Sequence, residues 1–188
     1  MPAFPRHPNS LVQLLREAQA EHGWLPRPLL AALARELGLT LAHVEGVASF
    51  YRFLHLQPVG RTRILFSDNI TDRMLGSEAL MADLCAHLGV QPGLMRADGR
   101  VSVAAASCTG LGDQGPALLV NHHQVVTRLD GERVARIAEL VEAEVPPAQW
   151  PAEWSVVADN VRRPDVLLAG GFAPGEALAA ALARGAEA

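Results

Sequence analysis

Polar side chains gather in two loops, each of which follows a predicted strand. The first loop covers residues 67–73, Ser-Asp-Asn-Ile-Thr-Asp-Arg, and the second covers residues 108–116, Cys-Thr-Gly-Leu-Gly-Asp-Gln-Gly-Pro. In α/β folds such loops usually carry the site, because rigid strands position them. We therefore expect the two loops to form one surface, which carries one thiol, carboxylates, hydroxyls, amides and one guanidinium group.

Cys108 supplies the only sulfur in these loops. Neighbouring backbone N–H groups could stabilise its thiolate, so a reactive thiol is one interpretation. Cys108 has no partner at C-x-x-C spacing and cannot cycle as a dithiol does. The other cysteine, Cys85, falls in an apolar helical stripe beside Leu84 and Leu88, where a cysteine is expected to be a small core residue.

A mononuclear metal site is a second interpretation. Its ligands would be Asp68, Asp72, Cys108 and Asp113, with His122 and His123 on a neighbouring hairpin. Adjacent residues of a strand point to opposite faces, so the two histidines are not expected to reach one ion. Solvated loop carboxylates are the simpler interpretation, and a polar plug made by Asp72 and Arg73 is a further hypothesis.

Three short amphipathic helices are predicted before these loops, over a bundle of residues 8–58. The helix starts are a Ser10–Gln13 capping box, a first-turn proline at position 28 and a cap at Thr40. Glycines at positions 23 and 38 end the first two helices. An aromatic cluster then precedes Pro58, and it consists of Phe50, Tyr51 and Phe53.

From Arg61 the hydrophobic spacing changes and predicts an α/β, thioredoxin-like domain over residues 61–145. Strands are expected over 62–66, 101–106, 116–120 and 124–127, and helices from Ser77 to Leu88 and over 132–145. The predicted order is β-α-β-β-α.

Prolines 146, 147 and 151 then open a Pro-rich linker and C-terminal tail over residues 146–188. Its two tryptophans, Trp150 and Trp154, either pack on the main domain or belong to a partner interface. A short apolar run at 166–168 and an Ala-rich helix after Gly175 are also expected. The glycines at 170–175 lack the spacing of a dinucleotide fingerprint, so this chain alone is not expected to bind FMN or NAD.

Composition excludes several classes of function. All sixteen basic residues are arginine and the net charge is −4, so neither a Schiff-base lysine nor a basic nucleic-acid-binding face is expected. The sequence contains no run of about 18 apolar residues, so membrane insertion is not expected. The N-terminus lacks the pattern of a secretion signal, which favours a cytoplasmic location.

Several short motifs occur together in the order typical of one family. They are His22-Gly23-Trp24-Leu25-Pro26, Ala48-Ser49-Phe50-Tyr51 followed by Pro58 and Gly60, Asp98-Gly99, Cys108-x-Gly, and Pro116-Ala117 with Val120-Asn121. Through them, residues 11–145 resemble the 24-kDa-type (NuoE-like) subunits of NADH dehydrogenases, in which a helical bundle precedes a thioredoxin-like 2Fe-2S domain. Residues 108–117 and 160–167 resemble more closely still the degenerate NuoE-like domain at the start of the diaphorase flavin subunit of soluble NAD-reducing hydrogenases.

The resemblance implies which residues stand at the cluster-ligand positions. In the family, a C-x4-C pair follows the first strand and a C-x3-C pair follows the second. The matching residues here are Ser67, Asp72, Cys108 and Gly112. Because a binuclear iron centre needs soft anionic sulfur at each of these positions, we expect this chain to bind no 2Fe-2S cluster.

The resemblance also implies an accessory, non-catalytic docking subunit or domain of a cytoplasmic NAD-linked oxidoreductase complex. The expected partner is a flavin-containing, NADH-oxidising (NuoF-like) subunit carrying FMN, NAD and iron–sulfur clusters, with hydrogenase or formate dehydrogenase subunits beside it. The expected interface is Phe50, Tyr51, Phe53, Trp150 and Trp154. Two alternatives stay open: an electron-transfer subunit that retains 2Fe-2S through atypical ligands and serves hydrogen, formate or quinone, and a redox-sensing protein built on Cys108.

Overall fold

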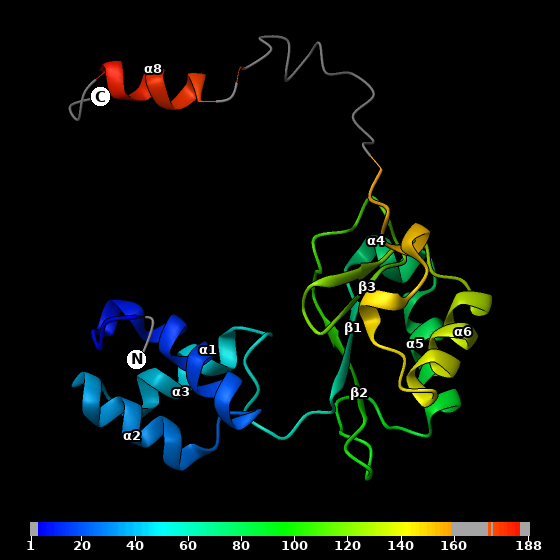
Figure 1. Cartoon of the computed structure of the whole chain (residues 1–188), viewed down its shortest axis with the longest axis horizontal. Helices are drawn as coiled ribbons and strands as arrows, with labels where there is room; N and C mark the ends of the chain where they lie inside the picture. Colours follow the sequence, from blue (N-terminus) through cyan, green and yellow to red (C-terminus); the bar gives the residue numbers. More distant parts are fainter. Residues whose placement is uncertain (1–3, 159–172, 174, 185–188) are drawn as a thin grey trace. The chain divides into compact units, whose positions relative to one another are not determined.

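The structure is a computed structural model that describes residues 4–158, 173 and 175–184. The chain divides into two compact units, Met1–Val157 and Ala158–Ala188 (Figure 1). In the second unit, helix α8 spans Glu176–Arg184, as the Ala-rich pattern predicts. The connector-like segment 160–167, the apolar run 166–168 and most of the glycine-containing stretch 170–175 lie outside the described residues. None of the described helices has the length and apolar character needed to cross a membrane.

The first unit begins with three helices, α1 (Leu11–His22), α2 (Arg27–Leu37) and α3 (Leu41–Phe50). Gly23 and Gly38 end α1 and α2 with left-handed φ angles of 80° and 65°, which cost glycine little. Thr40 caps α3 by accepting a hydrogen bond from the His43 N–H. The predicted capping box at Ser10 is wrong: a 3-10 turn over Pro8–Ser10 precedes α1, and the Ser10 side chain makes no cap hydrogen bond.

A four-stranded mixed sheet and its helices follow, which confirms the α/β, thioredoxin-like fold class. The elements are β1 (Thr62–Ser67), α4 (Ile70–Met74), α5 (Ser77–Leu88), β2 (Val101–Ala106), β3 (Leu118–Val120), β4 (Gln124–Val126) and α6 (Gly131–Glu142). The strand order is β2-β1-β3-β4. β1 pairs parallel with β2, whereas the β1–β3 and β3–β4 pairs are antiparallel.

Four details of this domain differ from the sequence-based expectation. Helix α4 was expected to be loop, and Gly76 rather than Ser77 occupies the cap position of α5. Strand β3 starts at Leu118 instead of Pro116, because proline has no N–H and the Ala117 N–H bonds to Asp72 rather than to a strand. Helix α6 ends before Glu144, whose φ of 54° leaves the helical region.

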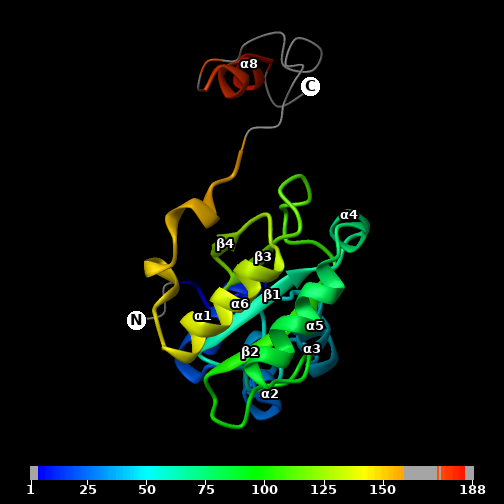
Figure 2. The ribbon, with the colours of Figure 1, turned by 90° about the vertical axis from the view of Figure 1, so that its right-hand side faces the viewer.

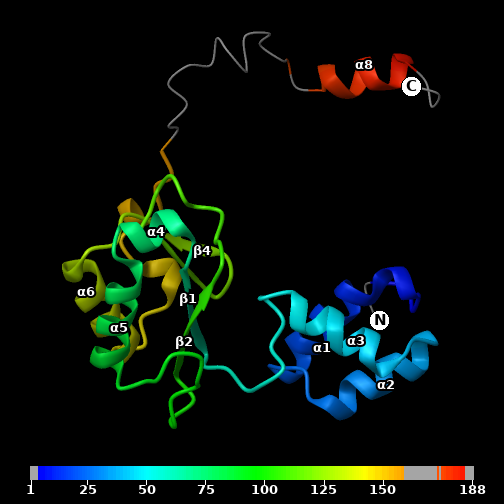
Figure 3. The same cartoon turned by 180° about the vertical axis from the view of Figure 1, so that it is seen from behind.

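Alternate residues of the sheet face two different environments. Ile64 and Phe66 of β1 are buried in a core formed with α5 and α6, which lie side by side over one face of the sheet (Figure 2). Arg63 and Leu65 point to the opposite face, where the connector from α3 runs (Figure 3). A separate apolar core lies among α1, α2 and α3.

Trp150 and Trp154 belong to the core beneath the sheet. They are 5% and 8% exposed, and the Trp150 Nε1–H donates to the Val145 carbonyl oxygen at 3.0 Å. Two 3-10 turns, Pro147–Gln149 and Ala152–Ser155, carry them. Both side chains are therefore packed on the main domain, which is one of the two possibilities that the sequence left open.

Gly60 permits the chain to enter β1 against the backbone of β2. A Cβ placed at position 60 would lie 2.5 Å from Val101 Cα and 2.7 Å from Ser102 N, and backbone atoms cannot move aside as a side chain can. We expect Gly60→Ala to lower the free energy of unfolding by about 1–3 kcal/mol, the usual cost of overpacking. Urea unfolding measures it.

Gly46→Ala is the matched control for that substitution. Gly46 lies within α3, and a Cβ there would meet nothing within 4 Å. Alanine should stabilise this helix by roughly 0.5–1 kcal/mol. Equal effects of the two substitutions would contradict the close approach at Gly60.

Candidate functional site

The loop after β1 folds back on itself around the side chain of Asn69. Asn69 caps α4: its Oδ1 accepts a hydrogen bond from the Asp72 N–H at 2.9 Å. Its Nδ2 donates to Ser67 Oγ at 2.9 Å and to Asp72 Oδ2 at 2.6 Å. One amide therefore joins the two ligand positions that this loop was expected to supply.

Asp72 is fully buried, with 0% of its surface exposed. Besides Asn69, it meets the second loop: Oδ1 accepts from the Ala117 N–H at 3.1 Å. Gly115 lies against the same carboxyl group, so that a Cβ there would stand 3.2 Å from Asp72 Cγ. Asp72 thus fastens the two loops together, and both of its oxygens have donors.

The second loop contributes the other two expected positions. Gly112 also faces Asn69, since a Cβ at Gly112 would lie 3.5 Å from Asn69 Nδ2. Cys108 is exposed at the start of the loop, and its Sγ accepts a hydrogen bond from the Gly110 N–H at 3.2 Å. Ser67, Asp72 and Gly112 therefore surround one amide, and the single thiol stands at the surface.

Arg73 does not take part in the polar plug that was expected of it. It points outward and pairs with Asp68 at 3.2 Å and with Glu78 at 3.3 Å, while about half exposed. These three residues line a small pocket of about 90 Å³ beside the loop. Asn69 takes the central place instead.

Sequence reasoning named Asn69 within the loop but assigned it no role. An available signal was the capping pattern itself, because an asparagine followed three residues later by an acidic residue often starts a helix. The hydrogen bonds from its amide to Ser67 and Asp72 needed the folded loop to be seen.

The alternative mononuclear metal site is not assembled. Asp72 accepts hydrogen bonds from Asn69 Nδ2 and the Ala117 N–H. Asp68 forms an ion pair with Arg73, and Asp113 accepts a hydrogen bond from Gln114 Nε2 at 2.8 Å. Across the part of the chain that the structure describes, no three His, Cys, Asp or Glu side chains are grouped as metal ligands.

The two neighbouring histidines lie in a turn and not in a strand, which corrects the expectation. Asn121 and His122 have φ angles of 51° and 67° between β3 and β4. His122 stacks on His55 of the connector, with ring centroids 5.0 Å apart and Nε2 atoms 3.0 Å apart, while His123 is exposed. Sequence reasoning missed this pair, whose members are 67 positions apart.

His55 links the two cores of the first unit. Its backbone N–H donates to Gln19 Oε1 at 2.6 Å and its carbonyl oxygen accepts from the Leu25 N–H at 2.7 Å, which holds it to the helical bundle. Its imidazole contacts His122 of the sheet domain. Burial, His122, Arg63 and Arg52 lower the pKa of His55 to about 4, and burial, Arg63 and His123 lower that of His122 to about 4.

These pKa values predict that acid weakens the fold. In the unfolded chain both imidazoles would titrate near their ordinary value of about 6.5. Between that pH and about 4 the unfolded state binds more protons, so the free energy of unfolding falls as the pH is lowered. Urea unfolding at pH 7.5 and at pH 5.0 measures the loss of stability as a lower urea midpoint at the lower pH.

His55→Gln should flatten this pH dependence, because one depressed imidazole is gone. His43→Gln is the control, because it replaces an exposed histidine of α3 that lies outside the His55–His122 pair. If the His55 variant lost as much stability on acidification as the unchanged chain, the pair would not be the cause.

Comparison with known proteins places the chain in a family. The family model described as "Thioredoxin-like [2Fe-2S] ferredoxin" matches residues 1–142. The chain belongs to the thioredoxin-like [2Fe-2S] ferredoxin family. The resemblance to NuoE-like subunits is thereby confirmed.

Similar members of the thioredoxin-like [2Fe-2S] ferredoxin family are, by name, E-type subunits of NADH-quinone oxidoreductases. The one from Rhizobium meliloti, which carries the number 2, is 32% identical over 142 residues, 74% of this chain and 83% of the relative. The one from Pseudomonas aeruginosa is 34% identical over 137 residues, 71% of this chain and 78% of the relative.

Two solved structures of NAD+-reducing [NiFe]-hydrogenase are also similar. The air-oxidized form matches 80% of this chain with 36% identity and a TM-score of 0.68, and the H2-reduced form matches 82% with 35% identity and a TM-score of 0.69. In both, the match spans only 26% of the hydrogenase chain.

The family's cluster can be tested against the residues that this member places at the site. A 2Fe-2S centre needs four donors of the thiolate type, occasionally with histidine in place of some. Here one position is a thiol, one a hydroxyl, one a carboxyl group already bonded to two donors, and one a glycine without a side chain. The amide of Asn69 lies among three of them. The residues present do not fit the cluster.

Proposed function

We propose that this chain is an accessory docking module of an NAD-linked oxidoreductase complex and binds no 2Fe-2S cluster itself. The observation that supports the missing cluster most strongly is the arrangement around Asn69. Sulfur is absent from three of the four family positions, and a hydrogen-bonded amide stands among those three. A protein that retained the fold without the ligands would keep the shape of the subunit and lose its electron-transfer centre.

The names of the relatives support the assignment to such a complex. The E-type subunits of NADH-quinone oxidoreductases and a chain of NAD+-reducing hydrogenase share this fold and about a third of the aligned residues. We infer a cytoplasmic assembly in which the partner is a flavin-containing, NADH-oxidising subunit or domain. That partner would carry the FMN, NAD and iron–sulfur centres, with hydrogenase or formate dehydrogenase subunits as further members.

The proposal also assigns a role to each part of the chain. Residues 8–58 would form the docking bundle, residues 61–145 the thioredoxin-like domain that has lost the cluster, and residues 146–188 the linker and tail. Phe50 is the best candidate for a partner contact because its side chain is 79% exposed at the end of α3. The Tyr51 ring meets the Phe50 ring edge-on with centroids 5.1 Å apart, and the Phe53 ring is tilted against Tyr51 with centroids 5.2 Å apart. Tyr51 and Phe53 are half-buried, and with the exposed Phe50 they make one aromatic surface.

Purification of the tagged chain from its native cell tests the docking role. Co-purifying FMN reports the flavin partner, and NADH oxidation with an artificial acceptor reports its turnover. Phe50→Ala should lower the FMN recovered per chain several-fold, because an exposed aromatic anchor commonly dominates an interface. Leu94→Ala is the matched control, since Leu94 is also exposed, at 52%, but lies outside the aromatic surface.

Cys108→Ser separates docking from chemistry in the same preparation. The proposal expects unchanged FMN recovery and unchanged NADH oxidation, because the thiol carries no electrons. Loss of turnover with FMN recovery intact would favour an electron-carrying or redox-sensing role for Cys108 and overturn the accessory role.

A further inference from the structure

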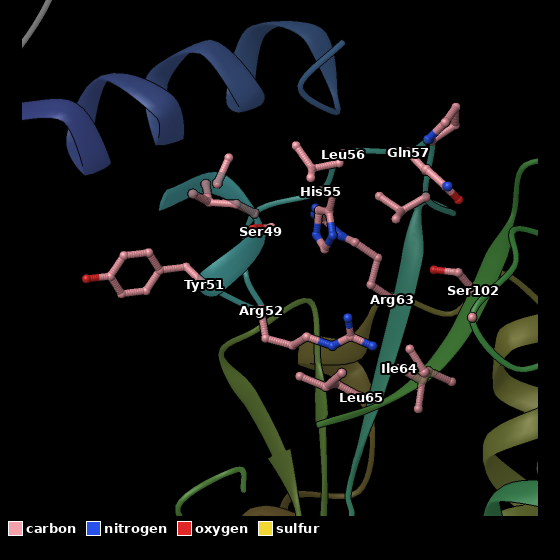
Figure 4. Close-up of a pocket in the computed structure, with 16 residues that line it drawn as sticks. Ser49, Tyr51, Arg52, His55, Leu56, Gln57, Arg63, Ile64, Leu65 and Ser102 are labelled. Carbon is pink, nitrogen blue, oxygen red and sulfur yellow. The ribbon is translucent and has the colours of Figure 1, made fainter. Parts of the chain in front are cut away.

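A pocket of about 320 Å³ lies between the connector from α3 and the outer face of the sheet. Arg52 and His55 come to it from the connector and Arg63 from β1, and Figure 4 shows these three side chains on the same side of β1. Apolar side chains, among them Leu54 and Leu65, form much of the remaining wall.

The two guanidinium groups have little to neutralise them. The Arg52 Nε–H donates to the Ala105 carbonyl oxygen at 3.1 Å, and the Arg63 Nε–H reaches Asn121 Oδ1 only at 3.5 Å. Neither arginine forms an ion pair with any residue that the structure describes, and no described residue lining the pocket is acidic. Burial lowers the pKa of Arg63, with no carboxylate to oppose the effect.

The Arg63 guanidinium is half-buried, whereas that of Arg52 is exposed. A half-buried charge without a counter-charge is costly, and proteins normally place such groups where a ligand or partner supplies the opposite charge. Guanidinium groups are suited to phosphate and carboxylate, because their N–H donors match two oxygens at once. Two guanidiniums balance the double charge of a phosphate monoester, whereas a single carboxylate would leave one of them unpaired. The pocket is also larger than a bare phosphate ion needs and falls at the lower end of small-ligand pockets, which span about 300–1,000 Å³.

We propose that this pocket binds a small organic phosphate, with the phosphate group between Arg52 and Arg63 and an apolar part against Leu54 and Leu65. The proposal does not require the docking role or the loss of the cluster, although Tyr51 of the aromatic surface also lines the pocket. The stacked imidazoles of His55 and His122 lie beside this pocket. A bound dianion would favour their protonated forms and raise both pKa values from about 4, so their titration detects binding. Arg52, Arg63 and His123 are the other charged or titratable groups that act on this pair.

Calorimetry and imidazole NMR on the full chain test the proposal with phenyl phosphate, inorganic phosphate and benzoate at constant ionic strength. Phenyl phosphate should bind more tightly than either of the others, because only it combines the dianion with an apolar group. Its binding should shift the His55 and His122 resonances. Loss of one charge-assisted contact should weaken binding about tenfold in Arg52→Gln and in Arg63→Gln.

Arg35→Gln is the control, because Arg35 is exposed on α2 and, among the residues that the structure describes, its side chain bonds only to the Ala31 carbonyl oxygen. It should bind like the unchanged chain. Arg52 is exposed, so its variant keeps the proposal testable should Arg63→Gln fail to fold. Absence of phenyl phosphate binding at millimolar concentration, equal binding of benzoate, or equal weakening by Arg35→Gln would each overturn the proposal.

Discussion

A chain with cysteine at positions 67, 72 and 112, and glycine in place of Asn69, is expected to take up a 2Fe-2S cluster that the unchanged chain does not. The three substitutions complete the family's set of four thiols together with Cys108. Asn69→Gly is needed because a Cβ at position 112 already comes within 3.5 Å of Asn69 Nδ2, so a sulfur there would meet the amide. Reconstitution under anaerobic conditions should give about two iron atoms per chain.

Two matched variants make this result specific. The same chain with Cys108→Ser has three thiols at the site and should bind far less iron. The three cysteine substitutions with Asn69 retained should also bind less, because the amide still lies between Ser67, Asp72 and Gly112 in the parent fold. If the chain with four cysteines and glycine at position 69 stayed colourless, these positions would not be the family's ligand positions.

Asp72→Ala is expected to cause the largest loss of stability among single substitutions at the site. It removes the acceptors of the Ala117 N–H and of Asn69 Nδ2 from a residue that is fully buried. Each donor left unsatisfied costs about 1–3 kcal/mol, so the free energy of unfolding should fall by roughly 3 kcal/mol or more. Chemical denaturation measures it.

Asp68→Ala is the control, because Asp68 is an exposed carboxylate that pairs with Arg73. An exposed ion pair contributes about 0–1 kcal/mol. Asp72→Asn should fall between the two, since an amide oxygen can still accept from Ala117 while its NH2 group faces that of Asn69. Equal stability of the Asp72 and Asp68 variants would mean that Asp72 does not fasten the loops together.

Several features that depend on near neighbours in the chain were predicted correctly from the sequence, although the capping box at Ser10 was wrong and helix α4 was missed. Leu11, Leu14 and Leu15 repeat at helical spacing and are buried in α1, and Gly23 and Gly38 end their helices where predicted. Val101–Ala106 is a strand with the predicted bounds. In each case the local structure follows from the spacing of apolar residues or from the ability of one glycine to adopt a left-handed φ angle.

Features that depend on contacts between distant segments were missed or left open by the sequence. Trp150 is buried because it packs in one core with residues of α5 and α6. The sequence alone left open whether it packs there or projects toward a partner. The contact between His55 and His122 arises only when the connector crosses the sheet. The same holds for the position at one pocket of two arginines that form no ion pair with a described residue. At the cluster positions, the missing sulfur could be read from the sequence through the family resemblance, whereas the amide of Asn69 among them could not.

The most direct test of the central claim is the iron and acid-labile sulfide content of the unchanged full chain, purified without exposure to air, with its visible absorption and its EPR spectrum after reduction. The account predicts a colourless protein with no iron above background and no EPR signal. Stoichiometric iron and sulfide with the spectrum of a binuclear centre would contradict it. Three of the four ligands of that centre would then have to be donors that the structure does not reveal.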